Sequence, residues 1–169
     1  LEALGAQIEI DAGYIVARAP GGLKGADIHF AKVSVGATEN VMMAATLAKG
    51  KTVLHNCARE PEIVDLGECL IAMGAKISGL GSERITIEGV SALHGATHSV
   101  VGDRIEAGTF AIAAAMTNGE VTLEGCSIDH LGALAHPLHL AGVDMTGDGQ
   151  RIHVRRAKPI LRGVDVMTE

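Results

Sequence analysis

Residues 32–36, with the sequence Lys-Val-Ser-Val-Gly, combine features that can bind a phosphate group. They separate a short alternating segment from an apolar stretch of helical periodicity, so they are expected to open a helix. The backbone amides and the dipole at a helix N-terminus attract anions. Gly36 would let a ligand approach the backbone, Ser34 can donate a hydroxyl proton, and Lys32 adds a positive charge. Composition alone favours the simpler interpretation, a capped helix with a surface lysine.

Two further charged segments stand at predicted helix starts. Residues 59–62, Arg-Glu-Pro-Glu, place acids at the positive end of a helix dipole, where local electrostatics alone explains them. Asp103 is expected to be the N-cap residue of another helix. Arg104 follows it, and a role for Arg104 in a hinge or cleft stays open beside a purely structural one.

The three cysteines do not form a disulfide framework or a zinc ribbon, because their number is odd and they lack a Cys-x-x-Cys pair. We therefore expect reduced thiols and a cytoplasmic protein. Cys57 and Cys126 each end an apolar strand, which indicates buried packing residues rather than a catalytic thiol. Cys69 lies within an apolar helix and is expected to pack there.

Histidines at helical spacing raise the question of a metal site. Two of them, His136 and His139, are three residues apart, and His130 lies about two turns earlier. They lack a His-Glu-x-x-His pattern and an acidic partner at ligand spacing. A solvated helix face explains them, so no metal site is expected there. Pro137 is expected to kink this helix because it removes a hydrogen bond.

Composition excludes several classes of protein. The chain has 169 residues, 47% of them hydrophobic and 20% charged, which is typical of a globular domain and not of a disordered chain. The net charge is −6, and the basic stripe that binds nucleic acid is missing. The longest apolar run covers residues 110–116, too short to span a membrane. We expect neither nucleic acid nor a membrane as a partner.

The chain repeats itself with a period of about 69 residues. LEALGAQI at residues 1–8 recurs as LIAMGAKI at 70–77 and weakly as LHLAGVDM at 138–145. LAKGKTVLHNC at 47–57 aligns with MTNGEVTLEGC at 116–126. Because separate landmarks agree on one period, the chain holds the end of one unit, two whole units and the start of a fourth.

Each unit is predicted to be βαβαββ, which makes the fold α/β. The first whole unit alternates strands and helices and ends in a hairpin with Gly79 and Gly81 in the turn. The helix near residues 103–119 is so rich in small apolar residues that burial on all sides is expected. The predicted segments are strands at 23–30 and 51–58, helices at 35–50 and 60–74 and a hairpin at 76–90, then a strand at 97–102, a helix at 103–119, a strand at 120–127, a helix at 128–143, a hairpin at 144–156 and a last strand at 161–168.

Four segments resemble the enolpyruvyl transferases that act on UDP-N-acetylglucosamine: KVSVGAT at 32–38, AREPEIVD at 58–65, GAKISGLGSERITIEGV at 74–90 and DRIEAGTF at 103–110. The resemblance implies an inside-out α/β barrel, in which six βαβαββ units form two globular domains. Residues 1–102 would hold the last two units of one domain, the first of them partial. Residues 103–169 would hold the crossover and the first unit of the other domain.

The same resemblance implies a function for the whole protein. The enolpyruvyl group of phosphoenolpyruvate would pass to the 3-hydroxyl of UDP-N-acetylglucosamine with release of phosphate, the first committed step of peptidoglycan synthesis. Neither a metal nor an organic cofactor is implied. The catalytic Cys and Asp and the lysine that binds phosphoenolpyruvate would lie in the remainder of the polypeptide, so this chain holds no catalytic residue. Glu60 and Glu62 would face the cleft, and the contacts to the nucleotide sugar would be Lys32, Val33, Ser34, Val35 and Gly36.

Two alternatives stay open. A 5-enolpyruvylshikimate-3-phosphate synthase shares this fold, although KVSVGAT and AREPEIVD argue against it. A ligand-binding module without catalytic activity, built from the same units, would also lack the catalytic loop. The mass of the intact protein would separate a module from an enzyme.

Overall fold

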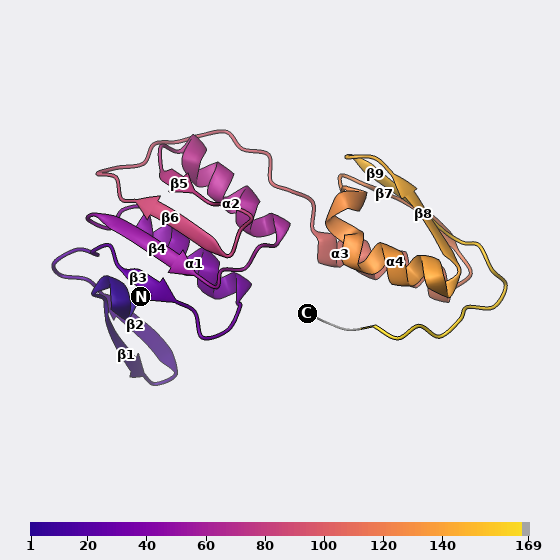
Figure 1. Ribbon diagram of the computed structural model, residues 1–169, viewed down its shortest axis with the longest axis horizontal. Helices are drawn as coiled ribbons and strands as arrows, with labels where there is room; N and C mark the ends of the chain where they lie inside the picture. Colours follow the sequence, from indigo (N-terminus) through magenta and orange to yellow (C-terminus); the bar gives the residue numbers. More distant parts are fainter. Residues whose placement is uncertain (167–169) are drawn as a thin grey trace. The chain divides into compact units, whose positions relative to one another are not determined.

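A computed structural model describes residues 1–166, and these divide into two compact units. The first unit is Leu1–Val100, and the second begins at Val101 (Figure 1). Each unit has its own hydrophobic core, so each is described by itself.

The first unit opens with the end of a repeat. A short 3-10 helix, η1 (Glu2–Leu4), is followed by an antiparallel hairpin of β1 (Gln7–Asp11) and β2 (Tyr14–Arg18). The same order of a helix end and a hairpin recurs 69 to 70 residues later, at the end of the next repeat. The predicted period is therefore visible in the secondary structure.

A complete βαβαββ repeat follows, as the sequence predicts. Its four strands form one sheet in the order β3-β4-β6-β5, in which β3 and β4 are parallel and the other neighbours are antiparallel. The elements are β3 (Asp27–His29), α1 (Val35–Ala45), β4 (Lys51–His55), α2 (Pro61–Ala72), β5 (Lys76–Ser78) and β6 (Arg84–Glu88).

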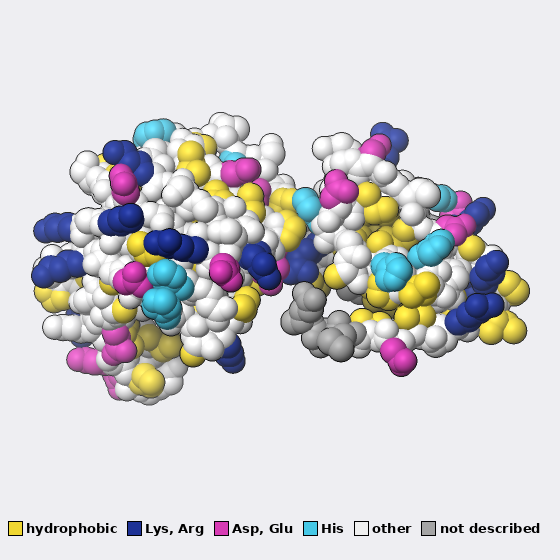
Figure 2. Space-filling view, in the orientation of Figure 1, with side chains coloured by type: hydrophobic (Ala, Val, Ile, Leu, Met, Phe, Trp, Pro, Cys, Tyr) yellow, Lys and Arg dark blue, Asp and Glu magenta, His cyan; other side chains and the backbone are white. Residues whose placement is uncertain are grey.

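One face of this sheet carries the core, and the other face is polar. On β4, Thr52 and Leu54 are fully buried, while the alternate residues Val53 and His55 lie on the more open face. The core includes Met42 of α1, Ile63 of α2, and Leu54, Ile85 and Ile87 of the sheet. Charged and histidine side chains gather on the side of this unit seen in Figure 2.

The residues at the two ends of helix α2 explain where it begins and ends. Pro61 is its first residue, where the missing amide proton costs nothing. Gly74 follows the helix with φ of 99°, a left-handed conformation that glycine adopts without strain. Between them, Ile63 and Leu70 face the core at helical spacing.

In residues 101–166, the second unit repeats this order with one strand fewer. Its sheet has the order β7-β9-β8 with antiparallel neighbours, which matches the β4-β6-β5 part of the first sheet. The elements are α3 (Arg104–Met116), β7 (Glu120–Glu124), η2 (Ile128–Leu131), α4 (Gly132–Ala141), β8 (Val143–Gly147) and β9 (Arg151–Arg156).

The strand predicted at 97–102 is not formed, and this part of the prediction is wrong. These residues have no regular structure. His98 is instead held by α2, where its Nε2 atom lies 2.9 Å from Oδ1 of Asp65, with both side chains mostly buried. Residues 97–100 thus belong to the first unit, and Val101 and Gly102 belong to the second. The last predicted strand is also not formed in residues 161–166, and 167–168 lie outside the described residues.

The prediction that helix α3 is buried on all sides is wrong as well. Its small residues Ala111 and Ala115 are buried, but Ile105 is 63% exposed and Phe110 52%. Within residues 1–166, none of the helices has the length and apolar character needed to cross a membrane.

Candidate functional site

Two loops lie at one edge of the first sheet. Because β3 and β4 are parallel neighbours, the loops that leave their carboxyl ends start from the same edge. Residues 30–34 lead from β3 into α1, and residues 56–60 lead from β4 into α2. The edge of a sheet where helices begin is a common place for a ligand in α/β folds.

The start of α1 is fixed by a short network of hydrogen bonds. Ser34 is the N-cap residue, and its Oγ accepts the amide proton of Ala37 at 3.3 Å. The buried Thr38 donates its hydroxyl proton to the carbonyl of Ser34 at 2.8 Å and accepts the amide proton of Ala58 at 3.1 Å. Thr38 therefore ties the first loop to the second.

A second pair of bonds holds the first loop to β4. The amide of Phe30 donates to the carbonyl of His55 at 3.1 Å, and Nδ2 of Asn56 donates back to the carbonyl of Phe30 at 3.0 Å. Asn56 has φ of 58°, a left-handed conformation that asparagine tolerates better than most residues. The backbone before Lys32 is thus anchored on the neighbouring strand.

The exposed part of the first loop is open to a ligand. Lys32 and Val33 are exposed, and a Cβ atom placed on Gly36 would meet no atom within 4 Å. The first turn of α1 carries no acidic residue, so no carboxylate there competes for its positive end. An α-helix also offers no internal acceptor to its first amides, which here belong to Val35 and Gly36. This arrangement can bind an anion.

The start of α2 differs in its electrostatics. Glu60 is the N-cap residue, and its Oε2 accepts the amide proton of Arg59 at 2.8 Å, while Glu62 lies in the first turn. These carboxylates already occupy the positive end of the helix, as the local explanation expects. The two loops meet through Thr38 and Ala58, so the segments at 32–36 and 59–62 belong to one edge.

Asp103 and the cysteines near the ends of β4 and β7 behave as structural residues. Asp103 is the N-cap residue of α3 and accepts the amide protons of Ile105 and Glu106 at 2.8 and 3.1 Å. Cys57 and Cys126 are buried, as expected, and burial raises the pKa of both thiols.

One cluster was missed in the sequence, although it contains metal-ligating side chains. Asp27 and His29 on β3 and His55 on β4 bring three possible ligand atoms within 4.8 Å of one another. The pattern Asp-x-His, with both side chains on one face of a strand, was the available indication. The third member lies 26 residues further along the chain, and only the pairing of β3 with β4 brings it close.

Comparison with known proteins shows where this arrangement belongs. Residues 1–168 match the family described as EPSP synthase (3-phosphoshikimate 1-carboxyvinyltransferase). The chain belongs to this family. Family membership covers both units, so the repeat is that of an enolpyruvyl transferase.

Curated relatives with high identity have a more specific name. A protein of Rhodospirillum centenum is 58% identical over the whole chain, and one of Acidiphilium cryptum is 59% identical. Both are named UDP-N-acetylglucosamine 1-carboxyvinyltransferase. The chain spans 39% and 40% of the length of these two relatives.

Solved structures agree on the fold. EPSP synthase from Acinetobacter baumannii has a TM-score of 0.68 at 23% identity and covers 98% of this chain and 40% of its own. The enolpyruvyl transferase NikO from Streptomyces tendae has a TM-score of 0.71 at 20% identity and covers 91% of this chain and 40% of its own. The predicted fold class is confirmed: the chain has the α/β fold of the enolpyruvyl transferases.

Proposed function

We propose that the full-length protein transfers the enolpyruvyl group of phosphoenolpyruvate to the 3-hydroxyl of UDP-N-acetylglucosamine and releases phosphate. The observation that carries the proposal is identity of 51–59% along the chain with relatives named for this substrate. Identity to EPSP synthase from Acinetobacter baumannii is 23% and 24% in two solved structures, which supports the shared fold and not shikimate as the substrate. The reaction would be the first committed step of peptidoglycan synthesis, in the cytoplasm, and would serve cell-wall growth, cell shape and division.

We assign the nucleotide-sugar contact in this chain to the loop at the start of α1. The residues are Lys32, Val33, Ser34, Val35 and Gly36. Three features of the site support the assignment: the exposed Lys32, the open space over Gly36, and a helix start without its own carboxylate. A diphosphate would accept hydrogen bonds from the first amides of α1 and a charge-assisted bond from Lys32.

The division of labour within the whole protein follows the same proposal. This chain would supply part of the wall that binds the nucleotide sugar, and the groups that bind phosphoenolpyruvate and catalyse the transfer would belong to the remainder of the polypeptide. The units at 1–102 and 103–169 would then belong to the two domains of the enzyme, with the crossover at the start of α3. Loss of contacts at 32–36 should therefore lower the affinity for UDP-N-acetylglucosamine and leave the affinity for phosphoenolpyruvate unchanged.

Calorimetric titration of the full-length protein tests the assignment. Lys32→Ala removes one charge-assisted hydrogen bond worth about 1.5–3 kcal/mol, which corresponds to about ten- to a hundredfold in affinity for UDP-N-acetylglucosamine. The matched control is Lys51→Ala, because Lys51 is also exposed but starts β4 at the opposite edge of the sheet. Affinity for phosphoenolpyruvate should change little in either variant.

Gly36→Val gives an independent arm. The added side chain meets open space in the fold, so a loss of affinity would reflect collision with the ligand. Gly132→Val is the matched control, because Gly132 also lies in the first turn of a helix with open space around it. Unchanged affinity for UDP-N-acetylglucosamine in both Lys32→Ala and Gly36→Val would overturn the assignment.

The enzyme and its alternatives are separated by one activity measurement. Phosphate release by the full-length protein should require phosphoenolpyruvate and UDP-N-acetylglucosamine together. Release with shikimate 3-phosphate instead would support the synthase, and ligand binding without release would support a module that lacks catalytic activity.

A further inference from the structure

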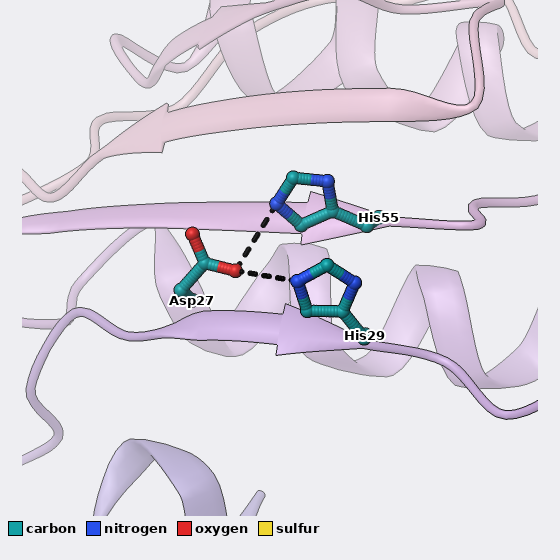
Figure 3. A group of neighbouring side chains, drawn as sticks. All are labelled: Asp27, His29 and His55. Atoms are coloured by element: carbon teal, nitrogen blue, oxygen red, sulfur yellow. Dashed lines mark ion pairs between the residues drawn. The ribbon is translucent and has the colours of Figure 1, made fainter.

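We propose that Asp27, His29 and His55 form a binding site for a divalent transition-metal ion, with Zn²⁺ as the first candidate. The site lies on the polar face of the first sheet, and it does not depend on the proposed transferase activity. Figure 3 shows the three side chains converging from two neighbouring strands.

The fold brings the three residues together by strand register. Asp27 and His29 are two residues apart on β3, so their side chains point to the same face. His29 is the direct partner of His55 in the parallel pairing of β3 with β4. The two imidazole rings stack with their centroids 4.0 Å apart and their planes within 1° of parallel.

The distances suit a shared ion. Oδ1 of Asp27 lies 3.0 Å from Nε2 of His29 and 3.1 Å from Nε2 of His55. With bonds of about 2.0–2.2 Å in a tetrahedral site, two donor atoms lie about 3.3–3.5 Å apart. Rotation of the exposed Asp27 and His29 side chains would widen these separations and admit the ion, and the remaining position would take water.

The nitrogen of His55 gives an independent indication that points to a ligand. Its Nε2 atom is shielded from solvent and forms no hydrogen bond among the described residues, although Oδ1 of Asp27 lies 3.1 Å away. In the tautomer protonated at Nδ1, this nitrogen would offer its lone pair to an ion held beside the Asp27 carboxylate. Coordination to a cation would satisfy it, since neutral imidazole is a common metal ligand.

The chemistry of the donors selects the class of metal. Two imidazoles and one carboxylate suit Zn²⁺, Ni²⁺ or Cu²⁺, whereas Mg²⁺ and Ca²⁺ prefer oxygen donors throughout. His29 and Asp27 are 72% and 63% exposed, so an ion would reach the site directly from solvent. Arg84, the partner of His55 on β6, adds a positive charge to the same face. We therefore expect an affinity on the order of micromolar.

Calorimetric titration with Zn²⁺ tests the proposal on the full-length protein, freed of any histidine tag and stripped with a chelator. The wild type should bind one ion. His29→Ala and His55→Ala should each lower the affinity for Zn²⁺ at least about tenfold. Mutation of a residue that only hydrogen-bonds to a metal ligand already lowers metal affinity by about that factor. Asp27→Asn keeps the shape of the side chain and should also weaken binding, which guards against loss of fold in the other two variants.

Two control variants separate this site from other surface histidines. His153 on β9 lies 3.0 Å from the carboxylate of Glu120, but it is outside the three-ligand cluster, so His153→Ala should bind Zn²⁺ like the wild type. His136→Ala removes one member of the His136–His139 pair on α4 and should also bind like the wild type.

Thermal unfolding gives a second readout. An ion that joins β3 to β4 should raise the unfolding temperature of the wild type and of His153→Ala, and not that of His55→Ala. The proposal is overturned if the wild type binds no Zn²⁺ up to ~1 mM, a free energy of only about −4 kcal/mol. It is equally overturned if the cluster variants bind as tightly as the wild type.

Discussion

The buried threonines of the first unit predict a graded response to one substitution, Thr to Val, which keeps the shape and removes the hydroxyl. Thr38 is fully buried, and its hydroxyl bridges the carbonyl of Ser34 and the amide of Ala58. In Thr38→Val the Ala58 amide stays buried and loses its acceptor. Leaving a buried donor unsatisfied costs about 1–3 kcal/mol, so we expect Thr38→Val to lose that much stability.

Two other buried threonines supply the comparison. The hydroxyl of Thr46 donates only to the carbonyl of Met43, which keeps a backbone hydrogen bond from the Thr46 amide. Thr46→Val should therefore cost less than about 1 kcal/mol. The hydroxyl of Thr52 is buried without a hydrogen-bond partner in the described part of the chain. Because burying an unpaired hydroxyl costs about 1–3 kcal/mol, Thr52→Val should stabilise by ~1 kcal/mol.

Urea unfolding of the full-length protein, followed by circular dichroism, measures the series. The expected order of stability is Thr52→Val above the wild type, Thr46→Val slightly below it, and Thr38→Val lowest. Thr38→Val should also weaken binding of UDP-N-acetylglucosamine, because the loop at 32–36 loses its tie to the loop at 56–60. If Thr38→Val proves no less stable than Thr46→Val, the hydroxyl of Thr38 does not hold the loop at 32–36 to the loop at 56–60.

Three further results are expected. Burial raises the pKa of the Cys57 and Cys126 thiols, so both should react with a bulky thiol reagent more slowly than the half-buried Cys69, and equally fast after unfolding in urea. Hydrogen bonds from the amides of Gln150 and Arg151 lower the pKa of Asp148. The Asp148 carboxylate therefore stabilises the fold above its unfolded-state pKa, and this stabilisation is lost as the pH falls through its folded-state pKa. Unfolding curves should show that Asp148→Ala lowers stability at neutral pH but not at a pH below both pKa values. The 169-residue chain alone should release no phosphate from phosphoenolpyruvate and UDP-N-acetylglucosamine, and release above background would contradict the placement of the catalytic groups elsewhere.

Local chemistry explains why most of the fold could be predicted from the sequence. Pro61 and Gly74 bound α2 because one lacks an amide proton and the other adopts a positive φ without strain. Gly79 and Gly81 mark the turn between β5 and β6 for the same conformational reason. Each of these residues determines only the conformation of its neighbours in sequence. A sequence that repeats every 69 residues therefore predicts the same order of helices and strands in each unit.

Pairing between distant segments explains what could not be predicted. LKGADIHF at 23–30, which contains β3, recurs as LHGATHSV at 93–100. A strand also needs a partner, however, and His98 lies against Asp65 of α2 instead. The candidate site divides in the same way. The cap by Ser34 follows from local sequence, whereas the contact of Thr38 with Ala58 spans 20 residues and depends on how the loops leave the sheet.

Helices α1 and α3 occupy the same place in successive repeats, and they show how composition and topology contribute separately to burial. Composition predicts burial of α3 on all sides, and small residues such as Ala111 and Ala115 do face the sheet of the same unit. That sheet covers only one side of the helix, so Phe110 and Met116 remain exposed at 52% and 72%. The apolar residues of a helix indicate how much of its surface can be buried. The number of elements packed around the helix determines how much of that surface is buried.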